Sequence, residues 1–317
     1  MSEPAPRLPS LCVVVVNWNG RDLLPDCLGS LADSDYPDLR VIMVDNGSAD
    51  RSVEWTRKHH PGVEIIETGA NLRWAGGNNV ALRRLADEGW PQDHVLLLNN
   101  DTIVPGGSLE RLCAGVAADE RAWAGTPRIV YADDPSRAWY DGGRVGAWSG
   151  WVHHAGIRRR TGTLPTRARP VEYGTGCALL VTRKGLAHGG LLDDGFHFYG
   201  EDVDYSLRLR RLGAVIRHVP RAVILHKVSV SLGAVSPRKA YLRSRSHVRL
   251  LARHWPARRW PVLGPAQLVY HAAHVLWHCW HGRPATALAM IDGVLDEIRH
   301  RPVPGAEVDR SADPMVT

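Results

Sequence analysis

The stretch VLLLNNDT, residues 95–102, is a short apolar run that ends abruptly in two amides and a carboxylate. An uninterrupted apolar run of this length is typical of a central strand covered on both faces, as in a parallel α/β sheet. Ligands of such sheets bind just outside the carboxyl ends of the strands. The stretch therefore predicts a buried strand and puts Asp101 where a substrate or a metal ion would bind, although capping of the next turn is an alternative role for a single carboxylate.

Two earlier runs have the same character. LCVVVV (11–16) ends in NWNG (17–20), and LRVIMV (39–44) ends in DNGSAD (45–50), with a helix predicted between them at 22–31. Strand, helix and strand within this length form a βαβ unit, whose fixed handedness brings both polar ends to one edge of the sheet. We therefore expect Asn17 and Asp45 to be neighbours. Capping of the next helix explains Ser48 or Asp50 but not Asp45, which precedes the turn.

Two loops rich in small residues are predicted to approach the same edge. NLRWAGGNN (71–79) opens a helix through paired glycines, which let backbone N–H groups approach a phosphate, although the spacing is not that of a dinucleotide site or a P-loop. GTGC (174–177) enters a strand at 178–181, where either a close ligand or tight packing explains the glycines. Neither loop identifies a ligand by itself.

The second decisive stretch is FHFYGEDVDYSLRLRRLG, residues 196–213. Three carboxylates begin the predicted helix and three arginines end it, the order that the helix dipole favours. The aromatic run before them needs a further explanation, since a carboxylate beside apolar rings is partly desolvated and suited to act as a general base. Further on, a predicted strand at 222–225 ends at His226, either a metal ligand or, as the local sequence alone favours, a hydrogen-bonded loop histidine.

Length and composition set the limits of the fold. The chain has 317 residues, 44% of them hydrophobic, which suffices for one large domain or for one domain with an appendage. The polar start does not predict a signal peptide, and no run of about 18 apolar residues predicts a membrane-spanning helix. The five scattered cysteines lack CxxC spacing. They indicate reduced, mostly buried thiols and a cytoplasmic location rather than disulfides or a zinc site.

Charge is distributed unevenly along the chain. Segment 205–291 contains no Asp or Glu and 15 Lys or Arg, which leaves 24 basic against 33 acidic residues elsewhere. Such a segment suits nucleic acid, an anionic membrane surface or a diphosphate-bearing substrate. No nucleic-acid recognition motif accompanies it, so we expect no nucleic acid partner. A peripheral contact at the inner face of the membrane and a role in binding substrate phosphate both stay open.

The C-terminal part is predicted to be helical. A basic helix is expected at 237–254, and a second helix at 265–281 carries one apolar face, formed by Leu268, Ala272, Val275, Leu276 and Cys279. His271, His274, His278 and His281 form an adjoining stripe. Histidines at this spacing could bind a metal, but no carboxylate or cysteine completes a site, so a polar, interfacial face is the preferred interpretation. Residues 1–10 and the tail at 302–317 are expected to be disordered.

Taken together, the motifs resemble the family 2 glycosyltransferases, in particular the rhamnosyltransferase-like branch. The matching segments are VVVVNWNG (13–20), VDNGSAD (44–50), NLRWAGGNN (71–79), LLLNND (96–101), GTGCALLVTRKGL (174–186), FYGEDVDYSLRLRRLG (198–213) and HKVSVSLG (226–233). They follow the family's order. The resemblance implies an α/β protein of the GT-A fold, a Rossmann-like, mostly parallel sheet flanked by helices. It spans 11–254, with a nucleotide-binding half at about 11–105, an acceptor half at about 106–254 and a C-terminal helical region at 255–301.

The resemblance also implies roles for single residues. Asp45 resembles the acid that contacts the nucleobase, and Asp202 resembles the catalytic base of the family's ED motif. Asp101 resembles the metal-binding acid of its DxD motif, and His226 a histidine that completes the metal or diphosphate site. The other residues of the predicted site bind the nucleotide (Asn17, Asn46, Gly76, Asn78, Asn100) or the acceptor (Trp74, Tyr199, Glu201). Several positions depart from the family pattern. Asn99 replaces the first DxD acid, Arg73 and Trp74 stand where Gly and Phe are common, and Arg245–Ser246 replaces an Arg–Asn pair.

These roles describe one reaction. Mg²⁺ or Mn²⁺, held by carboxylates and phosphates, neutralises the diphosphate charge that develops as the sugar leaves. Asp202 takes the proton of an acceptor hydroxyl that attacks from the opposite face, which inverts the anomeric configuration. We therefore expect an inverting, metal-dependent glycosyltransferase, a hexosyltransferase, that uses a nucleotide-diphosphate sugar. The leading donor is dTDP-rhamnose, and the acceptor is a glycan, a lipid-linked molecule or a small molecule.

Two alternatives stay open. A sugar nucleotidyltransferase also builds a nucleotide pocket on a parallel sheet, but it would need a loop rich in Gly and Arg or Lys after the first strand, where only Arg21 supplies a cation. A catalytically silent module that binds nucleotides or glycans is the other. The sequence does not decide the oligomeric state, and a homodimer is compatible with it.

Overall fold

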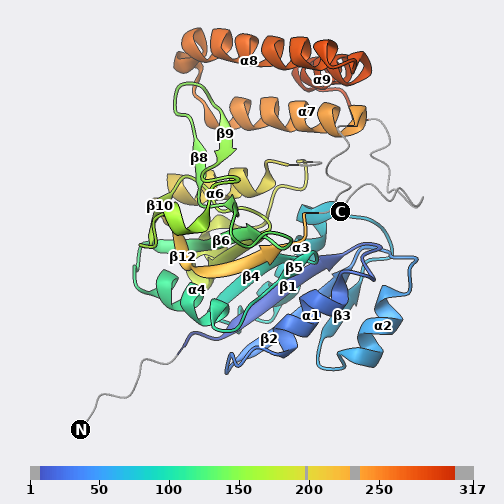
Figure 1. Ribbon diagram of the computed structural model, residues 1–317, viewed down its shortest axis with the longest axis vertical. Coiled ribbons are helices and arrows are strands. Elements are labelled where there is room, and N and C mark those ends of the chain that lie inside the picture. Colours follow the sequence, from blue (N-terminus) through green and yellow to red (C-terminus); the bar gives the residue numbers. More distant parts are fainter. Residues whose placement is uncertain (1–7, 197–198, 229–235, 304–317) are drawn as a thin grey trace.

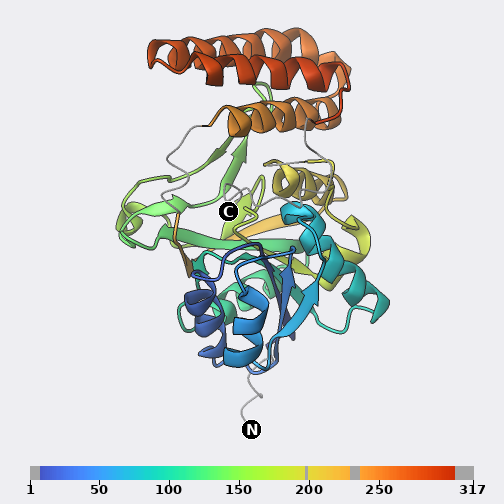
Figure 2. The same cartoon turned by 90° about the vertical axis from the view of Figure 1, so that its right-hand side faces the viewer.

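The computed structural model describes residues 8–196, 199–228 and 236–303. A mixed sheet of ten strands crosses the body of the molecule, and long C-terminal helices cover one end of it (Figures 1 and 2). Parts of two motifs, 197–198 of the aromatic run and 229–233 of HKVSVSLG, lie outside the described residues. Most of both predicted disordered ends, 1–7 and 304–317, lies outside them as well.

The first half of the sheet is parallel. The strands run in the order β4-β1-β2-β3, and α1, α2 and α3 connect them in the chain. The apolar runs of β1 and β4 are buried on both faces, as their uninterrupted composition predicts. The bounds are β1 (Leu11–Asn17), α1 (Leu24–Ala32), β2 (Leu39–Asp45), α2 (Ser52–His59), β3 (Glu64–Glu67), α3 (Arg73–Asp87) and β4 (His94–Asn99).

The second half continues the sheet with mixed directions. Strand β11 lies antiparallel between β4 and β6, and β12 runs parallel to β6 on the far side. The bounds are β5 (Thr102–Ile103), α4 (Ser108–Ala117), β6 (Ala122–Tyr131), β7 (Ala138–Tyr140), β8 (Gly143–Val145), β9 (Val152–His154), η1 (Thr161–Thr163), β10 (Arg169–Val171), β11 (Ala178–Thr182), α5 (Arg183–Gly189), α6 (Glu201–Arg211) and β12 (Val215–His226). The predicted α/β fold with a mostly parallel sheet flanked by helices is confirmed.

Strand β12 is longer than the sequence predicts. It starts at Val215 rather than at 222, and its pairing with β6 shifts register between Val219 and Val223. Pro220 lies within that interval and donates no backbone hydrogen bond, which is why the sequence pattern breaks there while the strand continues beyond an irregularity. Its last residues pair with β5, so that the end of β12 reaches the edge of the sheet at which β4 ends.

Three helices form a separate layer above α6 and the β8–β9 hairpin (Figures 1 and 2). They are α7 (Pro237–His254), α8 (Trp260–Trp280) and α9 (Pro284–Ile298), with the short η3 (Ala257–Arg259) before α8. Gly293 lets α9 approach α7 closely, because a Cβ atom there would lie 2.3 Å from the carbonyl oxygen of Tyr241. In space α7 thus belongs with α8 and α9. The domain boundary at 254–255 stays a prediction.

The apolar face of α8 points outward and part of its polar side is buried, which is the opposite of the orientation expected for an amphipathic helix. Leu268 and Leu276 of its apolar face are 72% and 69% exposed. Gln267 and His278, on the polar side, are buried instead. The predicted polar stripe is therefore wrong for His278, whereas His274 is exposed as expected. The amphipathic pattern was detected correctly, but it does not say which face the rest of the chain covers.

The thiols agree with the prediction of reduced, mostly buried cysteines. Cys12, Cys27, Cys113 and Cys177 are buried, Cys279 on α8 is exposed, and all five are free. Burial raises the pKa of Cys12, Cys27 and Cys113 to about 12, so these thiols stay protonated.

The basic segment is less free than its composition indicates. Within the described residues, at least six of its 15 cations form ion pairs with acids that precede or follow the segment, and they are Arg208, Arg217, Lys227, Arg245, Arg249 and Arg253. Glu297 of α9 binds both Arg245 and Arg249 of α7, at 2.8 and 2.7 Å. Three of these cations, Arg245, Arg249 and Arg253, lie on α7, and their ion pairs hold α7 in place.

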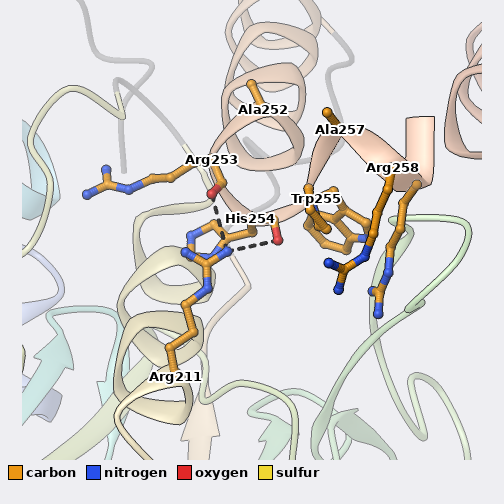
Figure 3. A pocket seen from close by; sticks show the side chains of 9 residues that line it. Arg211, Ala252, Arg253, His254, Trp255, Ala257 and Arg258 are labelled. Carbon is orange, nitrogen blue, oxygen red and sulfur yellow. Dashed lines mark hydrogen bonds between the residues drawn. The ribbon is translucent and has the colours of Figure 1, made fainter.

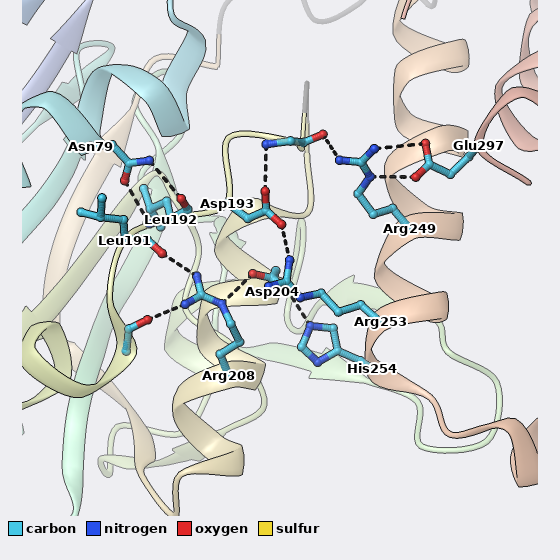
Figure 4. A network of polar contacts seen from close by, with 12 residues as sticks. Asn79, Leu191, Leu192, Asp193, Asp204, Arg208, Arg249, Arg253, His254 and Glu297 are labelled. Atoms are coloured by element: carbon cyan, nitrogen blue, oxygen red, sulfur yellow. Dashed lines mark hydrogen bonds and ion pairs between the residues drawn. The ribbon is translucent and has the colours of Figure 1, made fainter. Parts of the chain in front are cut away.

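Asp204 connects α6 to α7 (Figure 4). Its fully buried carboxylate lies 2.9 Å from Nε of Arg208, 3.2 Å from Nε of Arg253 and 2.8 Å from Nε2 of His254. Burial alone would raise the pKa of Asp204, but His254 and Arg208 outweigh burial and lower it. The carboxylate of Asp204, at the start of α6, thus has a structural role, which distinguishes it from the two carboxylates before it.

Replacing Asp204 by Asn should destabilise the protein, because Arg208 and Arg253 lose their buried counter-charge. We expect the free energy of unfolding to fall by about 3 kcal/mol in urea denaturation followed by circular dichroism. The matched control is Asp292→Asn on the exposed side of α9, which should change it by less than about 0.5 kcal/mol. Equal stabilities of the two variants would contradict a structural role for Asp204.

Candidate active site

The ends of β1 and β2 form one polar cluster. Asn17 and Asp45 are register partners, as expected from the βαβ unit, and Nδ2 of Asn17 lies 3.3 Å from Oδ1 of Asp45. Asn100 donates to Oδ1 of Asn17 at 3.0 Å, which adds the end of β4. Gly20 makes room for this contact, since a Cβ atom there would lie 2.3 Å from Nδ2 of Asn100. Three residues from three strand ends thus meet in a buried site.

Asn46 joins this cluster to the loop before α3. Its side chain is buried and donates to the carbonyl oxygen of Arg73 at 3.1 Å. Gly77 lies against it, with room for no side chain, because a Cβ atom would be 3.0 Å from Nδ2 of Asn46. The second oxygen of Asp45 accepts the backbone N–H of Ser48 at 2.9 Å. The predicted nucleotide-binding residues of β1, β2 and α3 therefore form one pre-ordered edge.

Trp74 connects two motifs across the site. Its indole N–H donates to Oδ1 of Asn99 at 3.0 Å, and its ring lies against Gly176, where a Cβ atom would be 3.0 Å from the ring. Asn78 donates to the carbonyl oxygen of Trp74 at 2.8 Å, while its own Oδ1 is buried with no hydrogen-bond partner among the described residues. Gly76 lies one turn into α3, beneath this contact. Two of the departures from the family pattern, Trp74 and Asn99, are thus hydrogen-bonded to each other.

Asp101 and His226 form a second buried pair. Oδ2 of Asp101 lies 3.0 Å from Nε2 of His226, and the backbone N–H of Lys227 donates to the carbonyl oxygen of Asp101 at 2.8 Å. Burial alone would lower the pKa of His226, but the neighbouring Cys177 and Asp101 outweigh burial and raise it well above its usual value. Oδ1 of Asp101 and Nδ1 of His226 are buried without a hydrogen-bond partner among the described residues.

These orphaned atoms fit a divalent cation. Buried polar atoms are almost always bonded, so an unpaired carboxylate oxygen indicates a missing partner. Mg²⁺ and Mn²⁺ are commonly held by one or two protein ligands, with substrate phosphates and water completing the shell. Across the described ranges no cluster of three or more His, Cys, Asp or Glu forms a complete metal cage. Asp101 and His226 therefore fit an ion that binds together with a phosphate-bearing ligand.

Asp202 lies at the start of α6, beside the Gly176 loop. Its Oδ2 accepts the backbone N–H of Gly176 at 2.7 Å, and its Oδ1 accepts that of Val203 at 2.8 Å. Burial raises the pKa of Asp202 in spite of these bonds. Burial raises the pKa of Cys177, His226 lowers it, and the charges of Asp101 and Asp202 add smaller upward contributions, so Cys177 is near both acids. The metal-binding candidate and the base candidate thus share one site.

Tyr199 and Glu201 flank Gly200 directly before Asp202, at the start of α6. Burial and the adjacent Asp202 raise the pKa of Glu201 from 4.5 to about 8, and its Oε2 has no hydrogen-bond partner among the described residues. Tyr199 is 40% exposed and has a positive φ of 66°, followed by Gly200 at 95°. This turn places Tyr199 at the rim. The predicted role of both residues in binding the acceptor stays a prediction.

Two aromatic residues near His226 were missed by the sequence analysis. The ring of Trp139 packs edge-on against His226 at a centroid distance of 4.6 Å and against His154 at 4.4 Å. Burial lowers the pKa of His154 to about 4, so this ring is neutral at physiological pH. Both residues come from a region whose sequence shows no periodicity. Only the pairing of β7 with β6 and of β9 with β8 brings them to the site.

A surface groove lies elsewhere (Figure 3). Arg211 and residues 252–259 line it, at the C-terminal end of α6, whereas Asp202 lies at the N-terminal end of the same helix. The guanidinium of Arg211 is already bonded to the carbonyl oxygens of Arg253 and His254, at 3.2 and 2.8 Å. The Asp101–Asp202 region, and not this groove, therefore stays the candidate active site.

Residues 12–187 match the family model described as glycosyl transferase family 2, which is more than half of the chain. The chain belongs to glycosyl transferase family 2. It is 30% identical over 285 residues to the N-acetylglucosaminyl-diphospho-decaprenol L-rhamnosyltransferase of Mycobacterium tuberculosis, covering 82% of this chain and 92% of the relative. It is 21% identical over 210 residues to a low-salt glycan biosynthesis hexosyltransferase of Haloferax volcanii, covering 64% and 62%.

Solved structures confirm the GT-A fold. The mannosyltransferase PcManGT from Pyrobaculum calidifontis, in complex with GDP-Man and Mn²⁺, superposes with a TM-score of 0.58 at 17% identity, over 93% of this chain and 89% of that one. GalNAc-T7 with UDP, GalNAc and Mn²⁺ gives a TM-score of 0.63 at 15% identity, over 93% and 58%. This family member is a rhamnosyltransferase-like glycosyltransferase. Within its described residues no helix is long and apolar enough to cross a membrane.

The raised pKa of Glu201 predicts a pH-dependent cost in stability. In the unfolded chain Glu201 loses its proton near 4.5, but in the folded protein only near 8, so folding becomes less favourable as pH rises between these values. Glu201→Gln removes this loss. We expect its melting temperature to exceed that of the wild type at pH 8 by more than at pH 5. A constant difference between the two pH values would contradict a buried Glu201. The control Glu54→Gln, at an exposed position on α2, should show the same difference in melting temperature from the wild type at both pH values.

Proposed function

We propose that the protein is an inverting, metal-dependent rhamnosyltransferase that uses dTDP-rhamnose and acts on a hydroxyl of a lipid-linked acceptor. The observation that carries the proposal is the joint placement of a desolvated carboxylate, Asp202, and a buried Asp101–His226 pair with an orphaned oxygen. The rhamnosyl donor and the lipid-linked acceptor rest on similarity to the mycobacterial relative, whose name specifies both a rhamnosyl transfer and a decaprenol-linked acceptor.

Different residues of this chain have different roles in the proposed reaction. The cluster of Asn17, Asp45 and Asn100 orients the nucleotide at the strand ends, and Asp101 with His226 holds the cation, which supplies charge neutralisation for the diphosphate. Asp202 accepts the proton of the acceptor hydroxyl. A raised pKa makes this carboxylate a stronger base than an exposed one, while the N–H groups of Gly176 and Val203 keep its orientation fixed. The acceptor oxygen bonds to the anomeric carbon in one step from the face opposite the breaking C–O bond, the nucleoside diphosphate leaves, and the configuration inverts.

The fold weakens the nucleotidyltransferase alternative. Arg21 is the cation that such an enzyme would need after β1 to bind a triphosphate. Its guanidinium instead lies over the ring of Trp55 at 4.4 Å, and its backbone N–H donates to Asp50 at 2.7 Å. The silent binding module is disfavoured because Asp101 and Asp202 are both present and both desolvated. The predicted homodimer and cytoplasmic location stay predictions.

Calorimetric titration with dTDP, UDP and GDP, each with and without Mn²⁺, tests the donor site. We expect dTDP to bind most tightly and only with the metal. Asp101→Asn keeps the shape and one hydrogen-bond acceptor but removes the charge, so it should weaken metal-dependent binding at least about tenfold. Asp292→Asn on α9 should bind as the wild type does. Identical curves with and without Mn²⁺ would remove Asp101 from a metal site.

Asp202→Asn should abolish transfer without loss of the nucleotide. Removing a general base lowers kcat by about 10²- to 10⁴-fold, measured here with dTDP-rhamnose and an N-acetylglucosaminyl diphospholipid. The dissociation constant for dTDP and Mn²⁺ should stay within about twofold, because this carboxylate does not contact the nucleotide in the proposal. Turnover of Asp202→Asn near the wild-type rate would overturn the assignment, and retention of configuration in the product would overturn the inverting mechanism.

A further inference from the structure

Helices α8 and α9 form the outermost layer of the molecule (Figures 1 and 2). Their outward side chains include a set of large, exposed apolar residues that we call the outer apolar face, and its members are Leu268, Val269, Leu276, Trp280, Leu288 and Ile298, between 61% and 88% exposed. Soluble monomers rarely leave a contiguous apolar surface of this kind uncovered. The face therefore indicates a partner.

The polar side of α8 is the side that the protein covers. The amide of Gln267 donates to the carbonyl oxygen of Ser149, and its Oε1 lies 2.9 Å from Nε2 of His247 on α7. His278 is buried against the neighbouring helices. An amphipathic surface helix normally does the reverse and buries its apolar stripe. The fold thus covers the side of α8 that carries Leu263, Gln267 and His278 and leaves the large apolar residues of the other side exposed.

The breadth of the face favours a bilayer over a second protein chain. The 21 residues of α8 include no Asp, Glu, Lys or Arg. Its exposed apolar positions spread over roughly half of the helix circumference, at 3.6 residues per turn. A helix that pairs with one partner helix needs only a narrow stripe. A helix that lies in the headgroup region is apolar over a broad arc instead.

The ends of α8 complement an anionic membrane surface, because aromatic and cationic side chains flank a helix that itself carries no charged residue. Trp260 begins α8 and Trp280 ends it, and tryptophan concentrates at membrane–water interfaces. Arg283 is exposed in the turn between α8 and α9, with its guanidinium 5.9 Å from the ring centre of Trp277. Cations beside such a surface bind anionic headgroups. No helix among the described segments can span a bilayer, so this layer would lie along it.

We propose that the outer apolar face docks the protein on the headgroup region of an anionic phospholipid bilayer, with α8 and α9 lying in the membrane plane. This surface differs from the one that the charge pattern suggests, because six cations of the basic segment are already paired within the protein. The layer covers the side of the molecule on which α6 lies (Figure 1), so docking turns the helix that carries Asp202 toward the lipid. The inference does not depend on the donor or acceptor proposed above.

Co-sedimentation of the full chain with vesicles tests the docking. The probe is phosphatidylcholine vesicles with and without phosphatidylglycerol, at about 0.1 M and about 0.5 M salt. We expect binding to the anionic vesicles that persists in part at the higher salt, since apolar burial is not screened. The double variant Leu276→Glu with Trp280→Glu should bind at least about tenfold more weakly.

The matched control carries the same charge change elsewhere. Ile157 and Leu212 are 50% and 52% exposed but lie outside α8 and α9, so Ile157→Glu with Leu212→Glu should bind as the wild type does. Circular dichroism confirms that both double variants are folded, and dTDP titration reports the donor site separately. Equal vesicle binding by the two double variants would overturn the proposal. A wild-type dimer in sedimentation equilibrium that ignores vesicles and dissociates in Leu276→Glu with Trp280→Glu would assign the face to a second copy instead.

Discussion

The contact between Asp101 and His226 joins residues 125 positions apart, and the rest of the site depends on it. It forms because β12 crosses the whole acceptor half and ends in antiparallel pairing with β5, directly after the strand that carries the polar motif. With that pairing in place, the Gly176 loop bonds to Asp202, and the ring of Trp139 packs against both His154 and the imidazole of His226. The pairing of β12 with β5 therefore both extends the sheet and brings the residues of the site together.

The sequence predicts the first half of the molecule well, for a physical reason. Strands buried on both faces are almost purely apolar, as in β1 and β4, so each one ends visibly where polar residues begin. The handedness of βαβ units then brings those ends together without any knowledge of side-chain contacts. The proximity of Asn17 to Asp45 follows from these two rules alone.

Features that depend on distant segments were not predictable in the same way. Asp202 bonds to Gly176, and Trp74 bonds to Asn99, across turns whose geometry no local pattern encodes. The three acids of α6 look equivalent as dipole partners, yet Asp204 is a structural ion while Glu201 is held protonated by burial. The orientation of α8 was predicted wrongly because periodicity identifies two faces of a helix but not the environment of either.

The distribution of the thiols has a practical consequence. Only the thiolate reacts readily with maleimides, and burial keeps Cys12, Cys27 and Cys113 both protonated and inaccessible. Cys279, by contrast, is exposed near the end of α8, between Leu276 and Trp280. The native chain therefore already contains one selective attachment point for a fluorophore or a spin label on its outermost helix. Spectroscopy of the surroundings of that helix needs no engineered cysteine.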